Sequence, residues 1–195
     1  MEQSPFLMPI PGELRVFVLE DLLSMSKVIE QKIEFQGRRI AVRRDRIVDA
    51  SGRETTRELV IHPGAVSIVS MPSNDEIVLI RQFRYATGEE LIEIPAGTIE
   101  PDEDPIDTAR RELEEETGYR AGQLDLRATY YTTPGFSDEI MYLYEGRELT
   151  LADQDLDDDE SIEVFLASRD EALQMIRKGR IRDAKTIVGL LTVLN

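Results

Sequence analysis

Four glutamates crowd the segment Arg111–Tyr119, which reads RELEEETGY. Asp104 and Pro105 suit the start of a helix and Gly118 suits its end, so this segment is predicted to close a helix. The carboxyl end of a helix carries partial negative charge, and acids three or four residues apart repel each other. Hard divalent cations prefer carboxylate oxygens and would offset this repulsion. The acids therefore predict a metal site.

The helical repeat sorts the side chains of this segment onto separate faces. At about 100° per residue, one face should lie on a sheet and carries Ile106, Ala109, Leu113 and Thr117. Glu112, Glu115 and Glu116 fall within an arc of about 100° beside that face, whereas Glu114 points toward water. The alternative is a solvated Glu-rich face. The disfavoured helix end and the preceding glycine-containing loop IPAGTIEPDEDP, which can bring backbone groups close to the acids, favour the metal.

The spacing around these acids resembles a known family signature. From Gly97 onward the sequence reads G, five residues, E, seven residues, then R-E-L-x-E-E-x-G-Y. This matches the Nudix hydrolase box at every fixed position, namely Gly97, Glu103, Arg111, Glu112, Leu113, Glu115, Glu116, Gly118 and Tyr119. The resemblance implies a Nudix fold and cleavage of a nucleoside diphosphate linked to another moiety, with two or three Mg²⁺ or Mn²⁺ ions.

The same resemblance implies roles for individual residues. Glu112, Glu115 and Glu116 would face the metals, with Glu115 also counted as catalytic. The Ala96 carbonyl would add a metal ligand. Arg111 and Glu103 would hold the loop and helix together.

Further segments resemble one Nudix subfamily, the ADP-ribose pyrophosphatases. YYTTPGFSDE places Pro134 fifteen residues beyond Tyr119, as in the proline loop of those enzymes, and RELVIHPGAV, LIRQFRY, ELIEIPAG and IRDAKTIVGL are similar too. The resemblance covers roughly residues 30–195 and implies hydrolysis of ADP-ribose to AMP and ribose 5-phosphate. Two alternatives stay open: GDP-mannose or another nucleotide sugar as substrate, and a ligand-sensing Nudix domain without catalysis. The complete set of box glutamates and the lack of a helix-turn-helix signal disfavour the second.

Substrate-binding candidates come from the same segments. Arg84 is the first candidate for a diphosphate contact, and strand alternation places Arg81 on the opposite face. Arg57 and Glu139 are weaker candidates for substrate contacts. Glu93 has two possible roles that the sequence does not separate. It could act at the site, as a ligand or by orienting one, or it could have a structural role.

A water that attacks phosphorus needs a base. In similar enzymes an acid after the proline loop acts as this base, and here that loop is DQDLDDDESIEV. Glu160 aligns best with that acid, and Asp157 to Asp159 are alternatives. The alternative is a mobile acidic surface loop without a catalytic role. A calcium-binding EF-hand is excluded, because counting from Asp153 places aspartate at the glycine position and Val164 at the final glutamate position.

Composition limits the other classes of function. Lys and Arg number 23 against 39 Asp and Glu, and the net charge of −16 disfavours nucleic-acid phosphates or an anionic membrane as the main partner. The absence of cysteine excludes disulfides and thiolate sites. No secretory leader or apolar run long enough to span a membrane is present, so a soluble, cytoplasmic protein is expected. His62, the single histidine, is expected to end a strand rather than bind metal.

The remaining patterns predict an α+β fold in which a mixed sheet is sandwiched between helices. A short helix is expected over 19–29, followed by strands over 32–62 with a turn at DASGRE. Strands are then expected at 65–71, 76–86, 90–95, 124–133, 139–146 and 161–168, with helices at 170–179 and 182–194. We expect a β-rich section over 1–58, which the resemblance implies forms a homodimer and contributes to adenine recognition, and a Nudix domain over 59–195.

Overall fold

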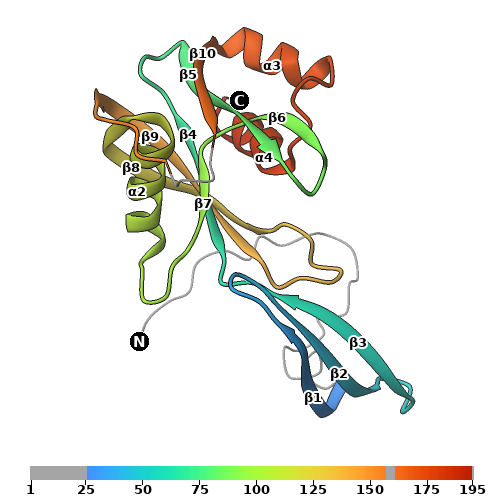
Figure 1. Cartoon of the computed structure of the whole chain (residues 1–195). Helices are drawn as coiled ribbons and strands as arrows, with labels where there is room; N and C mark the ends of the chain where they lie inside the picture. The colour runs from blue at the N-terminus through green and yellow to red at the C-terminus, as the bar shows by residue number, and fades with distance from the viewer. Residues whose placement is uncertain (1–25, 157–160, 195) are drawn as a thin grey trace, which may run out of the picture. The chain divides into compact units, whose positions relative to one another are not determined.

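The computed structural model describes residues 26–156 and 161–194 (Figure 1). Of these, residues 26–32 and 44–57 form one compact unit, and residues 33–43 with the rest of the described chain form a second. No helix in these two described ranges is long and apolar enough to cross a membrane. The expected functional division at residue 58 stays a prediction.

The first unit holds parts of three strands, β1 (Ser26–Gln36), β2 (Ala41–Asp49) and β3 (Glu54–Ile61), which pair in the order β1-β2-β3. The turn predicted between β2 and β3 is present. Asp49 accepts a hydrogen bond from the Ser51 N–H at 2.8 Å, and Gly52 takes a positive φ of 80°. Glycine adopts this left-handed conformation without steric cost, which explains its place in the turn.

The helix expected over 19–29 is wrong from residue 26 onward, because Ser26 begins β1; residues 19–25 lie outside the described ranges. Val28 and Ile29 are β-branched and suit a strand. Pairing with β2 decides the conformation here, and the apolar spacing within the segment does not.

The second unit contains two sheets. One has the order β7-β4-β9-β8 and is built from β4 (Ala65–Ser70), β7 (Ala96–Thr98), β8 (Tyr119–Tyr131) and β9 (Ile140–Leu151). β4 and β9 run parallel, whereas β7 and β8 pair antiparallel to their neighbours. The other sheet has the antiparallel order β10-β5-β6 and is built from β5 (Glu76–Arg84), β6 (Glu89–Glu93) and β10 (Ile162–Ser168).

Within the described ranges, three helices cover these sheets: α2 (Pro105–Thr117), α3 (Arg169–Arg177) and α4 (Ala184–Val193). α2 packs on β4, β7 and β8, and α4 packs on β4, β8 and β9, while α3 lies against β5 and β10 (Figure 1). The expected α+β arrangement of a mixed sheet between helices is confirmed.

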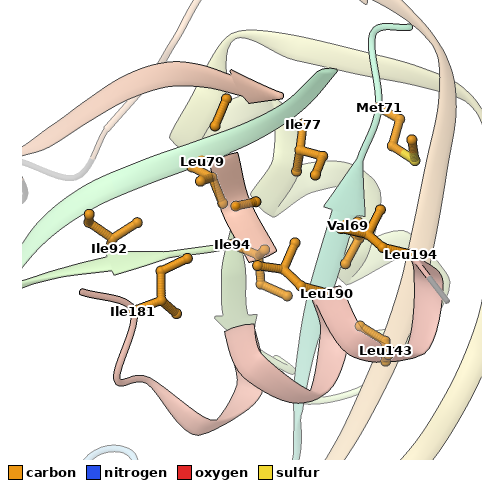
Figure 2. Close-up of a cluster of buried hydrophobic side chains, with 12 residues drawn as sticks. Val69, Met71, Ile77, Leu79, Ile92, Ile94, Leu143, Ile181, Leu190 and Leu194 are labelled. Atoms are coloured by element: carbon orange, nitrogen blue, oxygen red, sulfur yellow. The ribbon is translucent and has the colours of Figure 1, made fainter. Parts of the chain in front are cut away.

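Strand β4 is the centre of the core, and all six of its residues are buried. Val66 and Ile68 pack with Ala109 and Leu113 of α2. Val69 belongs to a second cluster that includes residues of β5, β9 and α4 (Figure 2). Each buried aliphatic side chain contributes about 1.5–3 kcal/mol. The first cluster therefore fixes α2 firmly on one face of β4, and with it the position of the acidic side chains.

Candidate functional site

Helix α2 has the boundaries that the sequence predicts. Asp104 is the N-cap residue and Pro105 is the first residue of the helix. The Asp104 carbonyl accepts the hydrogen bonds of the first turn, and its carboxylate makes no capping hydrogen bond. Gly118 ends the helix with a φ of 67°. The predicted inner face is also observed, since Ala109 and Leu113 are fully buried. The glutamates of the last turns consequently project beside the sheet.

Three of these glutamates, Glu112, Glu115 and Glu116, line a cleft of about 1120 Å³ whose lining residues all belong to the second unit. Six of the residues predicted to be catalytic or to bind substrate or metal contribute to it: Arg84, Ala96, Glu112, Glu115, Glu116 and Glu139. They come from β5, β7, α2 and the loop before β9, so the fold gathers side chains from four segments of the chain.

Two other predicted site residues have a different standing. Arg57 belongs to the first unit, where its guanidinium donates to the Thr56 carbonyl at 2.9 Å and to the Thr55 hydroxyl at 3.3 Å. Glu160 and the alternatives Asp157 to Asp159 lie outside the described residues. Their roles stay predictions.

Glu112 lies directly over the backbone of Gly97. A Cβ atom at position 97 would come within 1.8 Å of the Glu112 carboxyl carbon, so only glycine leaves room for this carboxylate. The glycine that opens the box thus permits a close approach between loop and helix. This explains in physical terms why the residue types at 97 and 112 belong together.

Arg111 binds three carboxylates at once. Its Nη1 donates to Glu112 Oε1 at 2.8 Å and to Glu115 Oε2 at 3.0 Å. Its Nε and Nη2 donate to the two oxygens of Glu103, each at 3.0 Å. Thr108 donates a further hydrogen bond to Glu103 at 2.8 Å. The Arg111 guanidinium, more than any other contact, lowers the pKa of Glu103 to about 2.

Glu116 is the most buried of the α2 glutamates, with only 4% of its surface exposed, and its Oε2 accepts the Ala96 N–H at 2.9 Å. With the side chains in this arrangement, no three acidic or histidine groups within 26–156 and 161–194 are close enough together to hold one ion. The predicted convergence is therefore incomplete: the acids share the cleft, but Arg111 lies between Glu112 and Glu115.

A second ionic cluster lines the same cleft. Glu93, at the end of β6, is only 1% exposed and accepts hydrogen bonds from Arg84 Nε at 2.9 Å and from Arg84 Nη2 at 2.6 Å. Lys185 of α4 forms a further ion pair with Glu93. Burial opposes ionisation of Glu93, but the contacts with Arg84 and Lys185 outweigh it, so the pKa of Glu93 lies below its ordinary value. Two nitrogens of the Arg84 guanidinium are thereby bound to Glu93, and the residue lines the cleft.

Arg81 follows the strand alternation that the sequence predicts. It pairs with Glu163 of β10 and lies over the ring of Phe165, with 5.4 Å between the guanidinium carbon and the ring centroid. It is not among the residues that line the cleft.

The proline loop is attached to the end of β3. Val60 donates to the Phe136 carbonyl at 2.8 Å, and the His62 N–H donates to Asp138 Oδ1 at 2.9 Å. Glu139 accepts a hydrogen bond from the Thr132 hydroxyl and lies 3.7 Å from His62 Nδ1. These contacts fix Glu139 at the cleft.

The start of the acidic loop is bonded to the end of α2. The Asp155 N–H donates to the Glu115 carbonyl at 3.1 Å, and Gln154 Nε2 donates to the Glu116 carbonyl at 2.7 Å. These bonds satisfy helix-end carbonyls that have no partner within the helix. Asp155 itself lines the cleft, so the loop expected to supply a base begins beside the acids.

The sequence reasoning missed His62, Asp155 and Lys185 as residues of the cleft. Asp155 carried a usable signal, since it lies in the acidic tract. Lys185 stood in the segment IRDAKTIVGL, but its pairing with Glu93, 92 residues away, leaves no trace in local spacing.

Comparisons with known proteins identify the family of this chain. A family model described as the NUDIX domain matches residues 61–188. The chain is 39% identical over 166 residues to the methanol dehydrogenase activator of Bacillus methanolicus and 38% identical over 166 residues to the ADP-ribose pyrophosphatase of Bacillus subtilis (strain 168); each match covers 84% of this chain and 90% of the relative. It is 38% identical over 136 residues to the GDP-mannose pyrophosphatase of Cronobacter sakazakii, which covers 65% of this chain and 71% of that protein.

A solved structure titled as an ADP compounds hydrolase superposes with a TM-score of 0.79 over 88% of this chain and 93% of that one. At 20% sequence identity, this likeness supports the fold alone. The family model and the bacterial relatives together show that the chain belongs to the Nudix family.

Proposed function

We propose that this chain hydrolyses the pyrophosphate bond of ADP-ribose, with water, to AMP and ribose 5-phosphate. The observation that carries the proposal is the match to the Bacillus subtilis ADP-ribose pyrophosphatase along 84% of the chain. A second protein of that name, from Mycobacterium tuberculosis, is 35% identical over 156 residues. The nine fixed positions of the Nudix box are all present as well.

The charges along the cleft suit this substrate. Arg84 offers positive charge to a diphosphate, and the α2 acids offer negative charge to any cation that accompanies it. A diphosphate with divalent ions presents the complementary pattern. The cleft volume of about 1120 Å³ is large enough for a dinucleotide-sized ligand.

Divalent ions, Mg²⁺ or Mn²⁺, are part of the proposal, and two or three of them are expected. The donors fit such ions by their chemistry, because Glu112, Glu115, Glu116 and the Ala96 carbonyl are hard oxygen ligands on one cleft. Arg111 would release Glu112 and Glu115 for this purpose. When bound, the ions would shield the diphosphate charge and lower the pKa of an attacking water.

The chain's own residues have separate tasks in the proposed reaction. Arg84 would bind a diphosphate oxygen, with Glu139 and Arg57 as further substrate contacts. A water oxygen forms a bond to one phosphorus, and a proton of that water passes to Glu160 or to one of Asp157 to Asp159. The bond from this phosphorus to the bridging oxygen then breaks, so each product leaves with one phosphate.

A second candidate substrate is GDP-mannose or another nucleotide sugar. It is supported by the relatives named GDP-mannose pyrophosphatase, which match 65% of the chain. The same cleft chemistry would serve, because the diphosphate is common to both substrates. Only contacts to the base and the distal sugar would differ.

We also propose that the chain acts in the cytoplasm as a homodimer, with residues 1–58 contributing to the dimer and to base recognition. The exposed apolar side chains of β1, including Val28, Ile33 and Phe35, support an interface there. Light scattering after size-exclusion chromatography tests this, because a mass near 22.2 kDa would contradict it and twice that mass would support it.

Product analysis tests the substrate proposal. Wild-type protein is incubated with ADP-ribose, GDP-mannose and other nucleotide sugars in the presence of Mg²⁺, and products are separated by chromatography. AMP and ribose 5-phosphate from ADP-ribose are expected, together with loss of product after chelation of the metal. Turnover of GDP-sugars alone would move the assignment to the second candidate. No turnover of any sugar would point to a ligand-sensing Nudix domain.

A further inference from the structure

Both carboxylate oxygens of Glu93 accept hydrogen bonds from charged side chains at the cleft. Three charged donors bind its two oxygens: Nε and Nη2 of Arg84 and Nζ of Lys185. Hydrogen bonds between ionised partners are about twice as strong as neutral ones, and a two-pronged guanidinium contact also fixes orientation. Glu93 therefore fixes the orientation of the Arg84 guanidinium.

The position of Lys185 is fixed independently by the first turn of α4. Asp183 caps this helix and accepts the Thr186 N–H at 2.9 Å, and the Lys185 ammonium lies 3.1 Å from the same carboxylate. Thr186 Oγ1 accepts the Ile94 N–H at 3.0 Å, directly after Glu93. The helix start is thus fastened to the end of β6 at two successive residues. Lys185, whose side chain is 13% exposed, has little freedom to leave Glu93.

The geometry of Arg84 shows what this arrangement leaves for a ligand. Its Nε and Nη2 are directed at Glu93, so Nη1 is the nitrogen that can serve a ligand in the cleft. The Arg84 side chain is 36% exposed, in contrast to the 1% of its carboxylate partner. Ordering a long, freely rotating side chain costs conformational entropy, and a pre-ordered arginine avoids part of that cost on binding.

We propose that Lys185 is a positioning residue, which holds Glu93 so that Arg84 presents Nη1 to the diphosphate of the substrate. Lys185 acts through Glu93 and Arg84 and makes no direct substrate contact. This inference rests on the proposed function, because it takes a diphosphate as the group that Arg84 meets. It extends that function to a residue of α4 far from the Nudix box.

A double-mutant cycle tests the proposal. Lys185→Met removes the ammonium at similar length, and Arg84→Gln removes the guanidinium. In the otherwise unchanged protein, Lys185→Met is expected to raise KM for ADP-ribose roughly tenfold. In the Arg84→Gln background the same change is expected to have no further effect, because residues that act through one another are not additive.

The division between KM and kcat separates positioning from a structural role. A disordered Arg84 weakens binding and raises KM, whereas partial misfolding lowers the amount of active enzyme and so the apparent kcat alone. Lys185→Arg, which keeps the charge, should restore part of the affinity. Lys178→Met is the matched control, since Lys178 is an exposed residue at the C-cap of α3 whose Nζ donates to Gln174 Oε1 at 3.3 Å. The KM of this variant should stay at the wild-type value.

A measurement without substrate completes the test. The NMR signal of the Arg84 Nε–H group should exchange slowly with water in the wild-type protein, because it is bonded to a buried carboxylate. Lys185→Met should accelerate that exchange several-fold. If Lys185→Met did not fold, Lys185→Gln would replace it in every arm.

The outcomes distinguish the two proposals. Losses that add in the Arg84→Gln background would show a direct substrate contact and overturn the inference, as would an unchanged KM or unchanged exchange of the Arg84 signal. If the wild-type protein cleaved no nucleotide sugar, the proposed function would fail, while the exchange measurement would still decide whether Lys185 orders Arg84.

Discussion

Two ionic clusters contribute to the same cleft and differ in their balance of charge. The β6 cluster consists of Arg84, Glu93, Asp183 and Lys185, so two cations face two carboxylates. The α2 cluster consists of Glu103, Arg111, Glu112 and Glu115, in which one guanidinium serves three carboxylates. One cluster is neutral and the other keeps an excess of two negative charges.

This difference separates two uses of buried charge. A neutral, hydrogen-bonded cluster can be buried. Removal of one member destabilises the fold, because it leaves a buried charge without its partner. A cluster with excess negative charge gains by accepting a cation. The β6 cluster should therefore matter most for stability and for the order of Arg84, and the α2 cluster for metal and catalysis. Substitutions in each can break or sharpen this comparison.

The largest effect is expected beside the α2 cluster. Glu116→Gln keeps an acceptor for the Ala96 N–H, so folding should be preserved. It removes a charged metal donor, and metal-dependent turnover is expected to fall by roughly a hundredfold or more. Steady-state kinetics across a Mg²⁺ titration measure this, with urea unfolding as the control. Wild-type turnover in this variant would remove Glu116 from the metal site.

In the β6 cluster, loss of charge should appear as loss of stability. Glu93→Gln leaves Arg84 and Lys185 without their shared carboxylate, and the free energy of unfolding is expected to fall by about 2–3 kcal/mol. Urea unfolding at neutral pH measures it.

The matched control is Glu163→Gln, which removes the partner of Arg81 from an exposed pair on the neighbouring strand. A loss of no more than about 0.5 kcal/mol is expected there. Equal losses in the two variants would contradict the comparison between buried and exposed charge.

Helix α2 and its faces were predictable because their causes are local. The proline at the start, the glycine at the end and the helical repeat lie within 15 residues, and Ala109 and Leu113 are buried as that repeat requires. The turn at Gly52 was predictable for the same reason. The helix expected over 19–29 failed where pairing with β2, a non-local cause, sets the conformation.

The residues of the site also differ in whether local sequence was enough to predict them. The acids of α2 and Arg84 were found from motif and strand pattern. Two features were not: the ion pair of Lys185 with Glu93, formed across 92 residues, and the Arg111 contacts to both Glu112 and Glu115. The ion pair of Lys185 with Glu93 joins segments that meet only in the folded chain. The contact of Arg111 with Glu115 has the i, i+4 spacing of neighbours on a helix and could have been predicted from the sequence.

A smaller effect, dependent on pH, is expected at the loop side of the α2 cluster. The pKa of Glu103 is lowered from 4.5 to about 2, chiefly by Arg111, so ionised Glu103 stabilises the fold above about pH 5. This contribution is lost as pH falls from 4.5 toward 2. Because the pair is partly exposed, we expect about 1 kcal/mol.

Urea unfolding of the wild type and Glu103→Gln between pH 7 and pH 3, without metal, measures the contribution of this carboxylate. The wild type should be more stable at pH 7, and the difference should shrink toward pH 3. A difference that stayed constant with pH would show that the Glu103 charge is not its source.

The smallest effect is expected at Glu114, the one glutamate of the segment that does not line the cleft. Glu114 pairs with Arg120 at 2.6 Å on the exposed side of α2 and is not part of the cleft. Glu114→Gln should leave kcat/KM and metal affinity within about twofold of wild type, because an exposed pair is screened by water and salt. Isothermal calorimetry with Mg²⁺ and steady-state kinetics measure both. A loss close to that of Glu116→Gln would mean that charge anywhere on this helix matters, and that the placement of Glu112, Glu115 and Glu116 on the cleft is not what selects them.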